Sequence, residues 1–538
     1  MNKYSIIIVI VVFLITVSVL AQSPGVQMGT TFYDYQTNGS SGNRIALCED
    51  GSMYICWMNA PNWPQPLRGV SYCWRSPSGN WDCGVLAERG AYPQLDIYNN
   101  IYGAIVYHTY STYIILAIDC PPWEFYDPPD STPDGGICFW PYITTDRNDR
   151  IHILMTEMNE SPGDFQRLFY TRSEDSGENW TIPKIVDTLV CLSSVIDASP
   201  VSDKVIIAYT HPTDFEICKY NDVVYDLSED GVHWHFIWGR VNITNYQYDN
   251  DSLWAYTDMD VIFDYNDNFH IIWNAVTIDS EGYIQRNTHL FHYNSATEEI
   301  NLIRIWPEEN EWGSGCEPGA WNLPICKMNL GVNESNVLFA TWTQFDTTDC
   351  SQGGYANGEI YMSYTLDGAN WQEPVNLTNS HTPNCYPEEC DSDHWSTLAD
   401  VVNDTLHIVY INDKDAGGIP QNEGVATENP VMYLAVPVDT IVGIRDKVQK
   451  PTNFSLNQNY PNPFNAITNI SFELKEPSAV LLEVFNITGA KVITLVDGYI
   501  SAGSHSITWN AEHLASGVYY YRLKANSTVK TKRAVLIK

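Results

Sequence analysis

The sequence predicts an all-β protein: a six- or seven-bladed β-propeller, with seven blades favoured, followed by a small β-sandwich. One hairpin pattern recurs seven times between positions 43 and 434. Its spacing of about 45 to 70 residues is typical of propeller blades with insertions. Tyr and Trp, which suit strands, are abundant at 34 and 18 residues. A final stretch without cysteine alternates apolar and polar residues in short runs, as a sandwich would.

The repeated unit is an apolar strand, a turn rich in Asp, Asn and Gly, and a second, strongly apolar strand. Such a unit predicts the inner hairpin of a blade. The seven copies cover residues 45–57, 95–107, 143–154, 195–209, 261–273, 325–342 and 398–410.

A chain of 538 residues is too long for one hydrophobic core, so several domains are expected. We predict a signal peptide at 1–21, the propeller at 22–440, a linker at 441–453 and the sandwich at 454–538. Lys3 precedes the apolar run 6–20, and Ala21 supplies a small residue for cleavage. A membrane anchor is the alternative, but the run is shorter than the roughly 20 apolar residues of a spanning helix.

The net charge of -37 argues against nucleic acid as a partner, because phosphate contacts need Lys and Arg. Solubility outside the cell explains this charge. Calcium binding by Asp-rich loops is the alternative, although the sequence holds no twelve-residue calcium loop. We therefore predict no cofactor, with calcium kept as the alternative. The cysteine spacings are not those of a zinc site, so no metal site is predicted.

Export makes disulfides expected among the 13 cysteines. Cys73 and Cys83 are the best pair, because they lie symmetrically about Ser78 in a predicted hairpin. The odd count leaves at least one thiol outside an internal pair. Other cysteines close in sequence are Cys48 with Cys56, Cys316 with Cys326, and Cys385 with Cys390.

A turn motif follows several of the repeated units. Residues 173–180 read Ser-Glu-Asp-Ser-Gly-Glu-Asn-Trp, with related forms at 228–234 and 365–371 and a degenerate one at 76–81. Asp accepts backbone N–H bonds, Gly takes positive φ, and Trp packs between blades. The motif resembles the Asp-box (BNR) repeats of sialidase-like propellers, in which these residues are structural. The matching positions are Ser173, Asp175, Gly177, Trp180, Asp230, Gly231, Trp234, Asp367, Gly368 and Trp371.

The long insertions are expected on one face of the disc, because successive turns alternate between its two faces. They cover residues 59–69, 119–139, 276–288, 307–322, 344–358, 378–393 and 412–430. Trp beside carboxylates suits glycan or protein binding, whereas the alternative is that the aromatics only pack the loops. The candidate ligand-binding residues are Trp63, Trp123, Trp312, Trp321 and Trp395.

The resemblance to sialidases raises glycoside hydrolysis. Arg44-Ile45-Ala46 looks like their first-blade Arg-Ile-Pro element, with Ala in place of Pro. Arg44 would then need two partner arginines, and Arg240, Arg286 and Arg304 lie in no matching motif. The catalytic candidates are Arg44, Glu388, Asp391 and Asp393. Three hypotheses remain: a surface or secreted propeller binding glycan or protein, a sialidase-like glycoside hydrolase, and a structural envelope protein.

The last stretch opens with Tyr460, Pro461, Asn462, Pro463, Phe464 and Asn465, where two prolines exclude a central strand. From Lys450 onward it holds nine Lys and Arg against five Asp and Glu. It resembles the C-terminal sorting domain of type IX secretion cargo, related to an immunoglobulin-like domain of flagellar hook assembly proteins. The matching segments are 456–465, 486–492, 502–505, 516–521 and 530–538, with Trp509.

That resemblance implies recognition by an outer-membrane secretion translocon. The protein would then be released from, or attached to, the surface of a Gram-negative-type bacterium. The alternative is a purely structural sandwich.

Overall fold

The structure is a computed structural model in which residues 23–538 are described, with gaps. The gaps are residues 65–66, 111–112, 158–164, 192, 214–218, 248–252, 280, 308–311, 313–314, 442–454, 457, 460–461, 475–477, 501–502 and 526–527. The predicted signal peptide therefore lies outside the described residues, as does nearly all of the predicted linker. The chain forms two compact units that divide after Val442.

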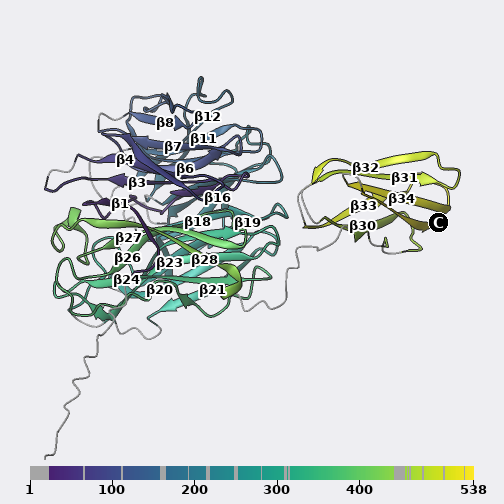
Figure 1. Cartoon of the computed structure of the whole chain (residues 1–538). Helices are drawn as coiled ribbons and strands as arrows, with labels where there is room; N and C mark the ends of the chain where they lie inside the picture. Colours follow the sequence, from purple (N-terminus) through teal and green to yellow (C-terminus); the bar gives the residue numbers. More distant parts are fainter. Residues whose placement is uncertain are drawn as a thin grey trace, which may run out of the picture. The chain divides into compact units, whose positions relative to one another are not determined.

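The first unit is built from antiparallel groups of four strands that follow one another along the chain (Figure 1). Each group is named here by its first strand. The first three are β2 (Ile45–Leu47), β3 (Met53–Asn59), β4 (Gly69–Arg75) and β5 (Trp81–Ala87); β6 (Ala91–Tyr98), β7 (Tyr102–His108), β8 (Ile114–Ile118) and β9 (Glu124–Tyr126); and β10 (Cys138–Thr145), β11 (Ile151–Glu157), β12 (Gln166–Ser173) and β13 (Lys184–Val190).

The next groups continue this order. They are β14 (Ser194–Ala198), β15 (Val205–Pro212), β16 (Asn221–Ser228) and β17 (Val241–Asn242); β18 (Leu253–Phe263), β19 (Phe269–Ile278), β20 (Ile284–Asn294) and β21 (Glu299–Trp306); and β22 (Ile325–Val332), β23 (Leu338–Cys350), β24 (Ala356–Thr365) and β25 (Val375–Asn376). One paired position, Asn221 with Ala255, joins the β14 and β18 groups into a single sheet.

The last group mixes both ends of the unit. It contains β26 (Ser392–Leu398), β27 (Thr405–Asp413) and β28 (Asn429–Pro437), and its fourth strand is β1 (Val26–Thr31). Figure 1 shows β1 in purple among the green strands of this sheet. The first strands of successive groups pack against one another from β2 through to β26, and β2 contacts β27. A ring of four-stranded sheets closed in this way is a β-propeller, which confirms the predicted fold class.

Half-buried carboxylates join the first strands of neighbouring groups. Asp96 on β6 accepts a hydrogen bond from the backbone N–H of Thr145 at 2.6 Å. Asp197 on β14 accepts one from Phe263 at 2.8 Å. Because these bonds cross from sheet to sheet, they fix each sheet against the next.

The turn at residues 173–180 is held by short-range hydrogen bonds. The Ser173 hydroxyl accepts the backbone N–H of Gly177 at 2.9 Å, and Asp175 accepts that of Asn179 at 2.8 Å. Gly177 has φ +95°, which glycine adopts without strain. Asp230 and Asp367 accept backbone N–H bonds in the two related turns.

The Trp side chains of these turns reach the third strand of the preceding group. Their rings lie 5.0 to 5.1 Å from their partners, an ordinary distance for aromatic pairs. The pairs are Trp81 with Tyr433, Trp234 with Tyr170, and Trp371 with His292. The contacts therefore lie between sheets.

The expected insertions at 276–288 and 344–358 are mostly strand. β19 and β20 extend the hairpin to Ile278 and from Ile284, and β23 and β24 extend theirs to Cys350 and from Ala356. Cross-strand pairs continue to Ile278 with Ile284 and to Cys350 with Ala356. Both segments therefore continue the sheets instead of forming loops.

Cys73 and Cys83 are disulfide-bonded at directly paired positions of β4 and β5, as the hairpin predicts. Cys385 bonds Cys390. Both bonds close short stretches of chain.

Cys316 and Cys326 are close in sequence but do not bond each other, because Cys316 bonds Cys350. A bridge between Glu317 and Tyr355 brings the Cys316 segment beside the end of β23, while Cys326 lies buried within β22. Cys48 and Cys56 are not bonded either, and both are buried thiols. Proximity in sequence did not predict these contacts.

The second unit is a sandwich of two sheets, as predicted. One sheet has the order β29 (Ser455–Leu456), β30 (Ile467–Leu474) and β33 (Gly503–Asn510). The other has the order β32 (Lys491–Ile500), β31 (Ser478–Asn486), β34 (Gly517–Ala525) and β35 (Thr528–Leu536). Phe464, Trp509 and Tyr521 are buried between them.

The entry segment of the sandwich is tied to β35. The amide oxygen of Asn462 accepts the N–H of Val535 at 2.8 Å, and the Phe464 ring lies 5.1 Å from that of Trp509. Pro463 and Asn465 flank Phe464, whereas Tyr460 and Pro461 lie outside the described residues.

Helix is scarce in the described chain. It consists of the single turns η1 (Ile419–Gln421) and α1 (Val438–Ile441). Among the described residues no helix has the length and apolarity needed to cross a membrane.

Candidate functional site

The connection from β1 to β2 fills the place where the first strands of the ring meet. Gln36, Ser40 and Ser41 are completely buried there. Carbonyls of this segment accept hydrogen bonds from three different groups: Gly39 from Lys327, Ser40 from Tyr142, Ser41 from Gln94 and Gly42 from Asn329. The protein's own backbone therefore occupies the centre of the ring.

Arg44 ends this segment and is 1% exposed. Its guanidinium donates to the Thr397 hydroxyl and to the carbonyl of Trp395. Burial lowers its pKa to about 10. The surroundings of Arg44 thus suit a structural cation, and the predicted role in a carboxylate clamp is not supported by its position.

The other arginines named from the sequence have partners of their own. Arg240 pairs with Asp187 at 2.5 Å and Arg286 pairs with Glu317. Arg304 lies over the Trp306 ring at 5.1 Å. These contacts do not gather the arginines around Arg44.

The acidic candidates near residue 390 are mostly interior. Asp393 is completely buried and accepts hydrogen bonds from Ser380 at 2.6 Å and Asn412 at 2.7 Å. Burial raises its pKa to about 7. Asp391 is 8% exposed and pairs with Lys414, whereas Glu388 lies exposed on the loop. A ligand could reach Glu388 but not Asp393 without a rearrangement.

The five Trp candidates do not share one surface. Trp395 is a core residue, because it lies on β26 at 2% exposure against Tyr35. Trp123 lies in the β8–β9 turn against Tyr72, on the face opposite the predicted one. Trp312 is half-buried and donates to the Cys316 carbonyl, and Trp321 is 49% exposed. Trp63 is half-buried beside Tyr33.

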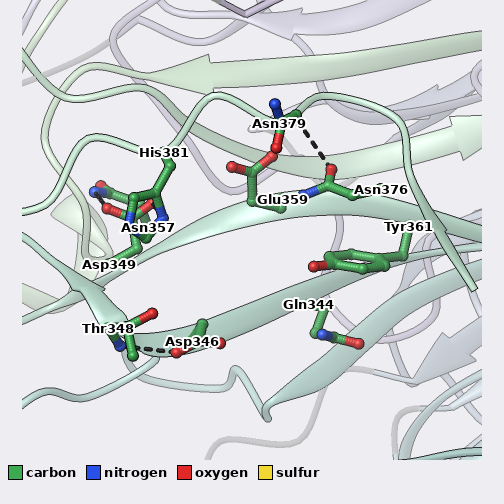
Figure 2. A pocket seen from close by; sticks show the side chains of 10 residues that line it. All are labelled: Gln344, Asp346, Thr348, Asp349, Asn357, Glu359, Tyr361, Asn376, Asn379 and His381. Carbon is green, nitrogen blue, oxygen red and sulfur yellow. Dashed lines mark hydrogen bonds and ion pairs between the residues drawn. The ribbon is translucent and has the colours of Figure 1, made fainter. Parts of the chain in front are cut away.

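A polar cavity of about 210 Å³ lies at the end of the β22 group, where β23 and β24 meet the loop 377–391 (Figure 2). Its walls carry three carboxylates, four carboxamides and two aromatic rings, but no Lys or Arg. The lining residues are Gln344, Asp346, Thr348, Asp349, Asn357, Glu359, Tyr361, Asn376, Asn379 and His381.

Strand geometry places the key side chains of this acidic pocket. Side chains alternate along a strand, so Asn357, Glu359 and Tyr361 share one face of β24. Gln344 lies opposite Glu359 on β23, and Asn376 lies opposite Tyr361 on β25. Figure 2 shows Glu359 between Asn376 on one side and the group containing His381 on the other.

Hydrogen bonds hold the carboxylates in place. Asp349 accepts Asn357 Nδ2 at 2.9 Å and the backbone N–H of Thr382 at 3.0 Å, and it pairs with His381 Nδ1 at 3.2 Å. Glu359 accepts the Thr378 hydroxyl at 2.5 Å. The donors come from both strand and loop, so the loop is part of the site.

Burial raises the pKa values of two carboxyl groups in the pocket. Burial raises the pKa of Asp349, and the neighbouring Asp346 raises it further. Burial likewise raises the pKa of Glu359, with a smaller contribution from Asp349. A group that donates hydroxyl hydrogens would relieve this concentration of negative charge.

Two disulfides brace the pocket. Cys350 follows Asp349 directly and bonds Cys316, while Cys385 Sγ lies 3.6 Å from Asn357 Nδ2 and bonds Cys390. One bond fixes the end of β23, and the other closes a short stretch of the loop 377–391.

Sequence reasoning missed this pocket. It treated 344–358 and 378–393 as separate insertions and weighted Trp over strand residues. The available signal was the polar alternation of Asn357, Glu359 and Tyr361 within an apolar strand. Within the described ranges, no three His, Cys, Asp or Glu side chains gather closely enough to hold a metal ion.

Residues 458–538 match the family model of the secretion system C-terminal sorting domain. The second unit is thus a sorting domain of the type IX secretion system, which indicates export to the cell surface or beyond. No curated protein matches the chain.

The chain is similar in fold to several solved β-structures. One is a polysaccharide lyase at 9% identity, covering 76% of this chain and 92% of that one, with a TM-score of 0.46. Another is an ulvan lyase of a new polysaccharide lyase family, at 12% identity. That match covers 76% of this chain and 96% of the other, with a TM-score of 0.45. A third is an α-L-arabinanase of Penicillium chrysogenum complexed with arabinobiose, at 10% identity. That match covers 64% of this chain and 93% of the other, with a TM-score of 0.41.

Proposed function

We propose that the protein is an exported saccharide-binding propeller that holds an uncharged sugar residue in the acidic pocket. The observation that carries the proposal is a cavity lined by the carboxyl groups of Asp346, Asp349 and Glu359 and by four carboxamides, without Lys or Arg. Carboxylates accept hydrogen bonds from hydroxyl groups, and carboxamides both accept and donate them. The secretion translocon would be the partner of the sorting domain.

The charge of the pocket restricts the ligand. A sulfated or uronic sugar would bring negative charge next to Asp349 and Glu359, whose pKa values are already raised. An uncharged hydroxyl-rich ring meets no such repulsion. Neutral saccharides are therefore the class that fits.

The size of the pocket restricts the ligand further. A volume of about 210 Å³ is below the roughly 300–1,000 Å³ of pockets for drug-sized ligands. The pocket therefore suits one ring of a longer chain. Tyr361 supplies an aromatic wall of the kind that contacts sugar C–H groups.

A glycan array probed with the full chain would identify the ligand, and calorimetry on the best hit would test the site. Glu359→Gln and Asp349→Asn should each weaken binding about tenfold or more, because hydrogen bonds to charged groups are lost. Glu334→Gln is the matched control, since it removes one exposed charge at the opposite end of the same sheet. Equal affinity in all four proteins would refute the site, and an array without binders would favour the structural envelope protein.

Glycoside hydrolysis is the second candidate. Asp349 and Glu359 share one pocket and both have raised pKa values, so one could donate a proton while the other stays ionised. Release of reducing ends that is abolished by Glu359→Gln would establish turnover. Binding without product release would leave the first proposal standing.

A further inference from the structure

A second cluster of polar and aromatic side chains lies at the start of β4, away from the acidic pocket. Arg68 directly precedes this strand, and its guanidinium carbon lies 4.9 Å from the Tyr33 ring centroid, 5.1 Å from that of Tyr110 and 5.5 Å from that of Tyr92. Trp63 extends the cluster, with its ring 6.5 Å from Tyr33. Four aromatic rings thus surround or flank one cation.

The tyrosine hydroxyls orient the guanidinium. Arg68 Nε donates to Tyr110 at 2.9 Å, and Nη1 donates to Tyr33 and Tyr92 at 3.4 Å each. The two N–H groups on Nη2 donate to none of the described residues. One edge of a fixed, planar donor therefore remains available to a ligand.

Arg68 carries its charge without a carboxylate partner. No ion pair joins it to a carboxylate among the described residues, and the groups that act on it electrostatically are Tyr92, Tyr33 and Tyr110. By contrast, Arg147, Arg150, Arg167, Arg172, Arg240, Arg286 and Arg522 each pair with an acid. A guanidinium held by phenols alone keeps its full charge for an external anion.

The backbone also presents aromatic residues next to this cluster. Tyr92 has φ +53° and Trp140 has φ +47°, each beside a register shift of its strand. Non-glycine residues at such φ values cost energy and persist where surrounding structure requires them. With Asn38, these residues surround a small gap that is too tight to admit a water molecule and that shares Tyr92 with the Arg68 cluster.

We propose that Arg68, Tyr33, Tyr92 and Tyr110, with Trp63 at the edge, form a subsite for a negatively charged sugar residue. The rings supply stacking surfaces and the Nη2 edge of Arg68 supplies the anion contact. The anion is a carboxylate or a sulfate ester, since both accept hydrogen bonds from a guanidinium edge. This subsite shares no residue with the acidic pocket, so either site can fail alone.

The test is titration of the full chain with three oligosaccharides of matched length: oligogalacturonate, an oligomer of dextran sulfate, and a neutral malto-oligosaccharide. The neutral oligomer measures stacking without charge. Arg68→Gln should reduce affinity for at least one anionic oligomer by about tenfold to 100-fold. Its effect on the neutral oligomer should be much smaller.

The matched control is Arg75→Gln, which removes the same charge at the opposite end of β4. It should leave all three affinities unchanged, and melting temperatures would confirm that both variants fold. The anionic oligomer that loses affinity in Arg68→Gln identifies the source of the anion. The proposal is overturned if neither anionic oligomer binds better than the neutral one, or if both arginine variants lose affinity equally. Glu359→Gln should not change anionic binding, which separates this test from that of the acidic pocket.

Discussion

The carboxylate of Asp260 on β18 accepts a hydrogen bond of 2.8 Å from the backbone N–H of Leu330 on β22. Asp96 and Asp197 make the same kind of bond to the first strand of the following group. Asp260 is buried and Asp96 is half-buried, and loss of solvation raises the pKa of Asp96 to about 6 and that of Asp260 to about 7. The bonds that join the sheets thus carry titratable groups.

Stability should therefore change with pH in an unusual direction. An unfolded Asp titrates near 3.9, so the folded protein holds these protons more tightly than the unfolded chain does. Their stabilisation is fully present below about pH 4 and is lost as pH rises through 6 to 7. Urea unfolding of the full chain should show the free energy of the propeller transition falling between pH 5 and pH 8, by a few kcal/mol in order of magnitude.

A carboxyl group with the opposite pKa shift and a substitution at Asp260 test the predicted pH dependence of stability. Asp367 behaves oppositely, because the backbone N–H of Asn370 lowers its pKa, so its contribution is lost as pH falls below about 4. Asp260→Asn removes one titrating group while its amide oxygen can still accept the Leu330 N–H. The variant should show a smaller decline between pH 5 and pH 8, and an undiminished slope would contradict the assignment.

Gly177→Ala should destabilise the propeller. A Cβ at this position would lie 3.0 Å from Tyr126 Cγ, and the residue has φ +95°. We expect a loss of about 2 kcal/mol, combining conformational strain with crowding. Gly51→Ala provides the control, since Gly51 has φ +84° with open space around its Cβ. If thermal unfolding shows the same decrease in melting temperature for both variants, packing against Tyr126 has no effect on stability.

Removing the Cys385–Cys390 bond should affect ligand binding. We expect the double Ala variant to bind saccharide several-fold more weakly, because Cys385 lies against Asn357 in the pocket wall. The Cys73–Cys83 double variant should keep full affinity while losing about 2–3 kcal/mol of stability. Calorimetry and thermal unfolding on both proteins would separate the effects, and equal affinity losses would contradict this role of the Cys385 loop.

The sorting domain should export a passenger protein. Residues 454–538 fused to a fluorescent reporter with an N-terminal export signal should reach the surface of a bacterium with type IX secretion. Phe464→Ala should reduce surface fluorescence, because a buried Phe contributes about 3–5 kcal/mol to a core of this kind. Tyr520→Ala is the control, since Tyr520 is 41% exposed on the same domain. Equal export of both variants would show that the folded core is not what the translocon requires.

Features that depend on nearby residues were accessible from the sequence. The repeated hairpins gave the fold class, and Cys73 and Cys83 could be paired because a single turn relates them. The hydrogen bonds that Ser173 and Asp175 accept in the turn at 173–180 come from residues at most four positions away. Spacing alone contains that information.

Features that depend on distant segments were not accessible. Cys316 meets Cys350 through a bridge of the Glu317 segment to Tyr355, and no spacing predicts it. Trp395 is next to His394 in an acidic stretch that reads as a loop, yet β26 buries it. The acidic pocket arises from three strands and a loop, each of which is ordinary by itself.

Closure of the ring through β1 has a consequence for folding. Thr30 donates to Glu428 across 398 residues of chain, so the contacts that complete the ring have very high contact order. Such contacts form slowly, because the entropy of closing a long loop is lost before they stabilise the chain. Until β28 has been made and reaches β1, both strands expose unpaired backbone groups that can pair with another molecule. Aggregation in the interval before closure is the hazard that this architecture creates for an exported chain.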